Sequence, residues 1–504
     1  MNGWFAYAPG EPQPDEPGPP DGPSLDLDVA EGLARALRDV LEMAGRAQPR
    51  TKSATVDWIE SHLGAPLGEL TTVTTEWPAW RHASVQSGVE AYLPPGVEWI
   101  GLRSRHVEHM ALIDLLMHEP GMGQTLAQPQ LIEVATGPDT MADAFRVALC
   151  RLATDDGSPV VLCLRRSDEH GPPQVAIELV LSDPKAGAPV LQRLRELVDE
   201  HDVLRGQVVT FGPSEHYGNH IVSFLPRPDV GPDDVVLPAG ILEQLSHHVL
   251  GIGDRAAQLT ELGFHLKRGL LLYGPPGTGK THTVRHLIAQ AVEATVIVLS
   301  GEGLAMIEPA TTLARRLTPS IVVVEDVDLI AQDRDYSPTG NPLLFSLLDA
   351  MDGVAADADV TFLLTTNRTA VLEDALVQRP GRVDLAVEIP RPDAAGRERL
   401  LRLYARDATL EADLTDAVAR TEGVTASAIK ELMRRAVLAA LDGGGTTITT
   451  RVLAACLDDF FADRARLTRA LLGDDASAAE AGPPPALNVG DDAFRSSLRL
   501  DFDA

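Results

Sequence analysis

The residues with the clearest chemistry form a glycine-rich run in the middle of the chain. The run reads Gly274-Pro275-Pro276-Gly277-Thr278-Gly279-Lys280-Thr281, and His282 follows it directly. Glycines at this spacing let backbone N–H groups surround a β-phosphate, the lysine places a positive charge beside the β- and γ-oxygens, and the last hydroxyl can ligate Mg²⁺. An apolar run precedes the glycines and a helix-like segment follows them. The pattern predicts a nucleotide-phosphate site between a strand and a helix.

Further polar residues follow two other apolar runs. Glu325 and Asp326 come directly after the run 321–324, and Asn367 comes directly after the run 362–366. An apolar strand that ends in acids is the pattern that holds magnesium and polarises an attacking water in P-loop nucleotidases. Arg379 and Arg382 lie beyond the asparagine, on either side of a Pro-Gly pair.

Taken in order, the phosphate loop, acidic strand, asparagine-tipped strand, arginine pair and final helical unit resemble the AAA family of ATPases, over residues 236–440. The resemblance implies an α/β fold, a parallel-sheet core with a helical lid. It also implies Mg²⁺-dependent conversion of ATP and water to ADP and phosphate, with the residues from Gly274 to His282 around the nucleotide and Thr281 and Glu325 at the metal.

The same resemblance implies catalytic roles. Asp326 stands at the position of the catalytic base, and Asn367 at that of the residue that orients the attacking water. Arg379 and Arg382 match the arginine fingers that reach the γ-phosphate in a neighbouring subunit. Fingers that act between subunits imply a homo-oligomeric ring, most often a hexamer in this family.

Two features depart from the usual family pattern. The acidic pair is Glu325 then Asp326 rather than Asp then Glu, an order similar to that of the mitochondrial AAA translocases of respiratory-complex assembly. The stretch 300–319, where the family carries a pore-facing aromatic, offers only Met306-Ile307-Glu308. The first feature leaves open whether the protein hydrolyses ATP or is a switch that only binds it. The second feature does not favour threading of a polypeptide by aromatic side chains.

Composition restricts the partners and the compartment. The chain has 504 residues and a formal net charge of −30, which argues against a nucleic-acid partner, because such binding relies on clustered Lys and Arg. Its three cysteines share no metal-ligand spacing, and no apolar run has the length of a membrane span. The amino terminus lacks the pattern of a signal peptide. These features predict a cytoplasmic protein with protein partners.

Composition also divides the chain into segments. We expect a disordered acidic, proline-rich arm, a small helical segment, an α+β amino-terminal domain that recruits partners, the large ATPase subdomain, the helical lid and a disordered acidic tail. Their expected bounds are 1–24, 25–85, 86–230, 236–391, 392–471 and 472–504.

Two functions remain open. The first is a ring-forming ATPase that remodels or translocates protein partners. The second is a nucleotide-dependent scaffold or switch with slow hydrolysis and no threading. The absence of a His-Glu-x-x-His motif argues against a zinc protease site within this sequence.

Overall fold

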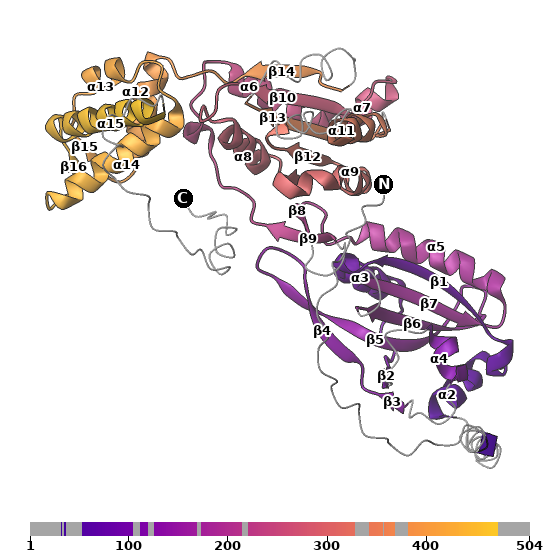
Figure 1. The fold of residues 1–504 in the computed structure, drawn as a ribbon. Helices are drawn as coiled ribbons and strands as arrows, with labels where there is room; N and C mark the ends of the chain where they lie inside the picture. The colour runs from indigo at the N-terminus through magenta and orange to yellow at the C-terminus, as the bar shows by residue number, and fades with distance from the viewer. Residues whose placement is uncertain are drawn as a thin grey trace, which may run out of the picture.

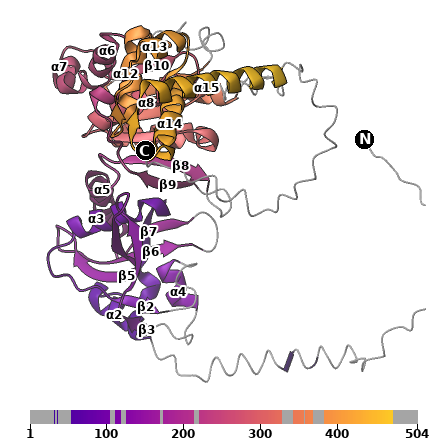
Figure 2. The same cartoon turned by 90° about the vertical axis from the view of Figure 1, so that its left-hand side faces the viewer.

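The computed structural model describes residues 32, 35–36, 53–103, 111–118, 125–168, 173–213, 220–327, 342–355, 357–367 and 382–471. These residues form a lower unit built on an antiparallel sheet, an upper unit built on a mainly parallel sheet, and a helical unit beside the upper sheet (Figures 1 and 2). The expected arm and tail, residues 1–24 and 472–504, lie outside the described residues.

The lower unit is a five-stranded antiparallel sheet with helices on both faces, which we call the five-stranded domain. Its strand order is β1-β7-β6-β5-β4. The strands are β1 (Thr71–Pro78), β4 (Gln130–Ala135), β5 (Met141–Ala153), β6 (Pro159–Ser167) and β7 (Gln174–Leu181). Helices α3 (His82–Tyr92) and α5 (Pro184–Glu200) pack on one face, and α2 (Ala54–Leu63) and α4 (Leu112–His118) pack on the other. A small ribbon of β2 (Gly101–Arg103) and β3 (Thr125–Ala127) lies beside β5.

The five-stranded domain begins earlier in the chain than composition predicts. Composition predicts a separate helical segment over residues 25–85, whereas β1 pairs with β7 from Thr71 to Pro78 and supplies an edge of the sheet. Helix α2 lies within that expected segment, but it packs on this sheet. The run Thr71–Pro78 is rich in β-branched and aromatic residues, and this is the local signal for a strand.

The upper unit is a seven-stranded sheet in the order β14-β10-β13-β12-β11-β8-β9. Six strands run parallel, and only β9 is antiparallel to its neighbour. The strands are β8 (Val208–Pro213), β9 (His220–Leu225), β10 (Arg268–Tyr273), β11 (Thr295–Leu299), β12 (Ser320–Val324), β13 (Val360–Thr366) and β14 (Leu385–Glu388). The central strands are continuous apolar runs, as parallel strands covered on both faces require.

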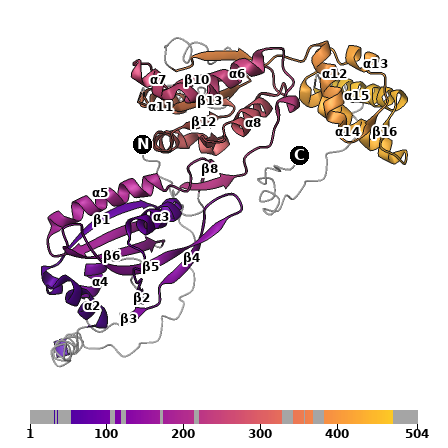
Figure 3. The ribbon, with the colours of Figure 1, turned by 180° about the vertical axis from the view of Figure 1, so that it is seen from behind.

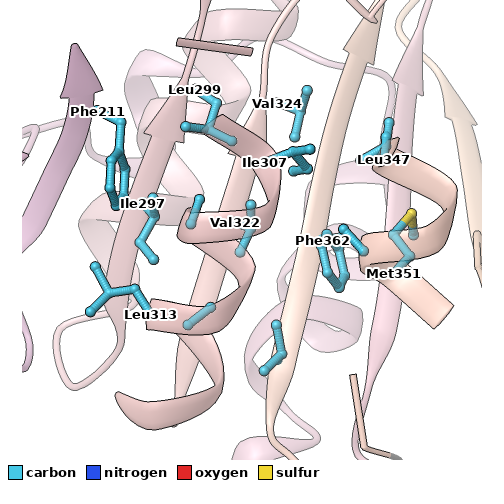
Figure 4. Packing of buried hydrophobic residues seen from close by; sticks show 14 of the residues in the cluster. Phe211, Ile297, Leu299, Ile307, Leu313, Val322, Val324, Leu347, Met351 and Phe362 are labelled. Carbon is cyan, nitrogen blue, oxygen red and sulfur yellow. The ribbon is translucent and has the colours of Figure 1, made fainter. Parts of the chain in front are cut away.

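Helices cover both faces of this sheet. Helices α6 (Ile241–Leu250) and α8 (Lys280–Gln290) pack on one face, with α7 (Ala256–Glu261) next to α6 in the chain. Helices α9 (Ile307–Arg316) and α11 (Pro342–Asp352) pack on the other face, where Phe362 fills the space beside α11 (Figure 4). The turn Gly301–Met306 leads into α9.

Strands β8 and β9 belong to the seven-stranded sheet and not to the five-stranded domain. Composition predicts that residues up to 230 belong to the amino-terminal domain, yet β8 pairs with β11 in parallel. The side chain of Phe211 on β8 joins the same apolar cluster as β11 and α9 (Figure 4). A strand from a distant segment can join a sheet wherever its apolar face continues the core. Sequence periodicity does not reveal which sheet it joins.

The helical unit is built from α12 (Ala394–Ala405), α13 (Thr415–Arg420), α14 (Ala426–Asp442) and α15 (Thr450–Leu471). Its own apolar cluster is formed by all these helices, and β15 (Thr409–Leu410) pairs with β16 (Thr447–Ile448) at one end. Figure 3 shows it at one side of the parallel sheet, beyond α8. We call this unit the lid.

An ionic cluster lies where the five-stranded domain meets the upper unit. The Arg81 guanidinium is 2% exposed and lies 2.7 Å from the carboxylate of Asp202 and 2.8 Å from that of Asp199. Arg316, at the end of α9, lies 3.0 Å from Asp199 and 3.5 Å from Asp202. Arg81, Asp199 and Asp202 all precede β8, so the contacts that cross to the upper unit are those of Arg316, which is 33% exposed.

Replacement of Phe211 tests whether β8 supports the ATPase core. Phe211→Ala removes a ring that is 3% exposed and should lower the free energy of unfolding of the upper unit by about 3–5 kcal/mol. Amide hydrogen exchange at Val296–Val298 of β11, the strand paired with β8, measures this effect directly. Exchange there should accelerate in Phe211→Ala and stay unchanged in Tyr92→Ala, a half-buried ring of the five-stranded domain. Equal exchange in both variants would contradict this role of β8.

Candidate functional site

The glycine-rich run forms the expected loop between β10 and α8. Gly274, Gly277 and Gly279 have φ angles of 144°, 76° and 108°, which side-chain-bearing residues rarely adopt. Helix α8 begins at Lys280, so the backbone N–H groups of its first turn face the loop. This helix end has the geometry of an anion site, because unpaired N–H groups and the helix dipole both favour negative charge.

Lys280 lies at the centre of the site and is 6% exposed. Its Nζ donates hydrogen bonds to the carbonyl oxygens of Gly274 at 2.9 Å and Pro275 at 3.0 Å, and to Asn367 Oδ1 at 2.8 Å. Asn367 Nδ2 in turn donates to Asp326 Oδ1 at 3.0 Å. Three residues from distant parts of the sequence thus form one hydrogen-bonded chain.

The sheet order explains why these three residues meet. Strand β13 lies between β10 and β12 and is parallel to both. The phosphate loop, Asn367 and the acidic pair each follow the carboxyl end of one of these strands. Parallel neighbours end at the same edge of a sheet, which is where α/β proteins bind their ligands.

Asp326 has an unusual backbone conformation. Its φ angle is 51°, one of two positive values that the described residues other than glycine show. Its backbone N–H donates to Thr365 Oγ1 at 3.0 Å, and its side chain is exposed while that of Thr365 is buried. Sparsely populated backbone conformations gather at functional sites. The sequence analysis does not single out Thr365, although its position at the end of the asparagine-tipped strand is a usable signal.

Glu325 occupies a different environment from Asp326. Burial raises the pKa of its carboxyl, while a hydrogen bond from the Thr281 hydroxyl opposes that rise. Asp326 adds to the rise and Arg285, one turn further along α8, opposes it. The Thr281 hydroxyl and the Glu325 carboxylate are hard oxygen donors of the kind that Mg²⁺ prefers, so the donor set fits this metal. Bound there, Mg²⁺ would neutralise phosphate charge.

The lid covers one side of the site. This side is the one nearest to the segment that precedes α6, which we call the linker. Ser427 N donates to the Gly277 carbonyl oxygen at 3.0 Å, and a Cβ added at Gly277 would lie 2.1 Å from Ser427 Oγ. A cavity of about 10 Å³, large enough for one water, is lined by Val236, Leu237, Thr278 and lid residues. An adenine ring at this place would therefore require the lid to move away.

His282 faces the linker and not the phosphate loop. Its Nε2 lies 3.1 Å from the Asp234 carbonyl oxygen, and burial lowers the pKa of its imidazole. One turn later in α8, His286 Nδ1 lies 2.9 Å from the Val230 carbonyl oxygen. The two imidazoles fix residues 230–234 along α8, so in the structure His282 positions the linker.

The structure describes one of the two candidate finger arginines, Arg382. Arg382 is 4% exposed, and its guanidinium contacts the Asp352 carboxylate with nitrogen–oxygen distances of 2.7 and 3.1 Å. This differs from the expectation of a side chain that extends toward a neighbouring subunit, because Asp352 at the end of α11 provides a bidentate partner within the chain. Arg379 lies outside the described residues.

The raised pKa of Glu325 gives a testable pH dependence of magnesium binding. A carboxyl whose pKa is raised takes up its proton at a higher pH than an ordinary glutamate and then no longer binds a cation well. The Mg²⁺ concentration that gives half-maximal ATP turnover should therefore rise as pH falls toward this pKa. Glu325→Gln should raise that concentration at high pH and flatten its pH dependence, whereas Glu308→Gln, on the exposed side of α9, should behave as the parent. A pH profile unchanged in Glu325→Gln would contradict the assignment.

Comparisons with known proteins agree with this geometry. Residues 270–391 match the model of the family described as "ATPase family associated with various cellular activities (AAA)". The chain is 33% identical over 267 residues to the ATP-dependent zinc metalloprotease FtsH 3 of Sphaerobacter thermophilus, covering 50% of this chain and 53% of that protein. It is 32% identical over 235 residues to the proteasome-activating nucleotidase of Methanocaldococcus jannaschii, covering 43% and 53%.

A eukaryotic relative shows the same range of similarity. The chain is 31% identical over 243 residues to the 26S proteasome regulatory subunit 6A of Encephalitozoon cuniculi, covering 44% of this chain and 60% of that protein. The matches to the first two relatives thus span about half of each relative's length.

Within the described part of the chain, no helix is both long and apolar enough to cross a membrane. The glycine loop, the parallel strand order and the family match together identify residues 270–391 as an AAA ATPase domain.

Proposed function

We propose that this protein is a ring-forming ATPase that uses Mg²⁺-dependent ATP hydrolysis to remodel protein partners, and that it does so in the cytoplasm. The single observation that carries the proposal is the hydrogen-bonded chain from Lys280 through Asn367 to Asp326. It places a phosphate-binding cation, a water-orienting amide and an exposed carboxylate side by side. Phosphoryl transfer needs such positioning and charge neutralisation more than it needs covalent chemistry.

The proposed roles follow from the two environments of the acidic pair. Asp326 accepts the proton of the attacking water, because its carboxylate is exposed and is oriented by the Asn367 amide. Glu325 and Thr281 hold Mg²⁺, because they are hydrogen bonded to each other on the side of the loop. Lys280 exchanges its loop carbonyl contacts for the β- and γ-phosphate oxygens when ATP binds.

We propose that Arg379 completes the site of a neighbouring subunit in a homo-oligomeric ring, for which the resemblance favours a hexamer. For Arg382 to do the same, it would have to leave Asp352. A guanidinium that meets charge developing in the transition state lowers the barrier without tightening nucleotide binding.

The five-stranded domain is the proposed partner-binding unit. The Arg81, Asp199, Asp202 and Arg316 cluster joins it to α9, and Trp80 packs edge-on against Phe211 with ring centroids 6.2 Å apart. Force generated in the ATPase unit therefore passes to whatever this domain holds. The names of two relatives, a proteasome-activating nucleotidase and a 26S proteasome regulatory subunit, support a role directed at proteins.

A second function, a nucleotide-dependent scaffold or switch, is favoured by the segment that replaces the aromatic pore loop. Ile307 is 3% exposed and Met306 packs against the same apolar cluster, which leaves only Glu308 of this trio exposed. These side chains cannot act as paddles on a threaded polypeptide while they remain in the core. Stimulation of hydrolysis by a protein partner would favour the remodeller over the scaffold.

Separate amide substitutions of Asp326 and Glu325 test the roles of the two acids. Asp326→Asn should leave ATP binding intact and reduce phosphate release by about 100-fold or more, because the base is lost. Glu325→Gln should instead weaken the response to Mg²⁺. Calorimetric ATP binding and phosphate release, measured on both variants, separate the two effects. Unchanged phosphate release in Asp326→Asn would transfer the role of base to Glu325.

Mixing experiments test whether an arginine acts between subunits. Arg379→Ala should lower turnover with little change in ATP affinity, as expected of a group that acts in the transition state. Mixing Arg379→Ala with Asp326→Asn subunits should restore part of the activity, because some interfaces then combine an intact base with an intact arginine. The same mixture with Arg382→Ala tests the second arginine. A protein that remains monomeric with ATP and Mg²⁺ and hydrolyses ATP at the full rate would exclude the ring.

A further inference from the structure

The two edge strands of the five-stranded domain are not equivalent. Strand β1 is accompanied by α5, and its exposed positions are Thr74, Glu76 and Pro78. At the opposite edge, β4 and the outer half of β5 form a hairpin that extends beyond the rest of the sheet (Figures 1 and 3). Among the described residues, β4 pairs only with β5, so its outer backbone edge is not used by another strand.

Large apolar side chains are exposed on this hairpin. Leu131 on β4 is 54% exposed and Met141 on β5 is 57% exposed. They lie on one face, because Leu131 is paired with Phe145 and Ala135 with Met141, at alternate positions of the ladder. By contrast, β1 carries no exposed large apolar residue. Exposed Leu and Met beside an unused strand edge are features of a binding surface.

A pair of like charges lies between these apolar residues. Glu133 is directly opposite Asp143 on the same face of the hairpin, and both are exposed. Neither carboxylate makes an ion pair with a cation in the described part of the chain. Like charges directly opposite each other destabilise a strand pair. A basic side chain placed over them would remove that repulsion and gain two charge-assisted contacts.

An aromatic pair continues the same face toward α3. The Trp99 and Phe145 rings are half-buried, with centroids 4.8 Å apart. Phe145 follows Asp143 by two positions in β5, so the rings and the carboxylates lie along one strip. Aromatic residues, Met and uncompensated acids together match a partner segment that is both apolar and basic.

We propose that β4 is a docking strand for an extended segment of a protein partner, which adds to the sheet edge and places a basic side chain over Glu133 and Asp143 between apolar side chains. The inference rests on the proposed function only in taking the partner to be a protein. Backbone hydrogen bonds along β4 supply affinity, and the alternating apolar and acidic positions supply specificity. The repulsion between Glu133 and Asp143 is present in the free hairpin, and the partner's basic side chain would relieve it.

Strand peptides of defined sequence provide the test on the full-length chain. The probe is an acetylated, amidated, fluorescent peptide Thr-Val-Thr-Lys-Thr-Val-Thr, which presents Val, Lys and Val on one face. Fluorescence anisotropy should show binding at least tenfold tighter than that of the same peptide with Glu in place of Lys. Methylation of alternate peptide nitrogens should abolish binding, because it removes the hydrogen bonds to the strand edge.

Matched variants locate the binding site. Glu133→Lys with Asp143→Lys should weaken the peptide at least tenfold, whereas Glu76→Lys, on the other edge strand, should leave its affinity unchanged. Equal weakening by Glu76→Lys, or undiminished binding of the methylated peptide, would overturn the docking strand. ATP hydrolysis without peptide should stay at the parental rate in both variants, since neither edge touches the nucleotide site. Failure of the docking strand is thereby distinguished from failure of the ATPase proposal.

Discussion

The parallel order of β10, β13 and β12 is the constraint on which the site depends. Because the three strands are neighbours and run the same way, the groups that follow them meet at one edge of the sheet. The 2.8 Å contact from Lys280 to Asn367 and the 3.0 Å contact from Asn367 to Asp326 are consequences of that order. Every residue of β12 and β13 is buried, which keeps these strands in the middle of the sheet, where helices cover both faces.

The same sheet also determines how the rest of the chain is connected to the site. Strand β8 extends the sheet on the side away from β10 and brings the five-stranded domain against α9. There Arg316 contacts Asp199, beside the Arg81–Asp202 ion pair. Arg227 reaches back to the end of α8, donating to the carbonyl oxygens of Ile288 and Ala291. Both ends of α8 are thus fixed, one by the phosphate loop and the other by the segment that enters from β9.

Electrostatic environment distinguishes residues that the sequence makes look alike. Glu325 and Asp326 are adjacent acids, but burial raises the pKa of Glu325 while Asp326 faces solvent and the Asn367 amide. Likewise Arg382, which the resemblance assigns to a neighbouring subunit's site, is buried against Asp352. Neighbours in three dimensions, rather than residue type, set these differences.

The sequence alone predicts the phosphate loop, the apolar strands at 269–273, 321–324 and 362–366, and the helical lid. These are local signals, because glycine spacing, short apolar runs and helical periodicity each report on a few adjacent residues. Only the tertiary structure decided that β1 belongs to the five-stranded domain, that β8 joins the ATPase sheet, and that Met306 and Ile307 pack into the core. Each of those outcomes depends on which distant apolar face offers the better burial. A single sequence does not encode that choice at any one position, so it emerges only when the whole chain is packed.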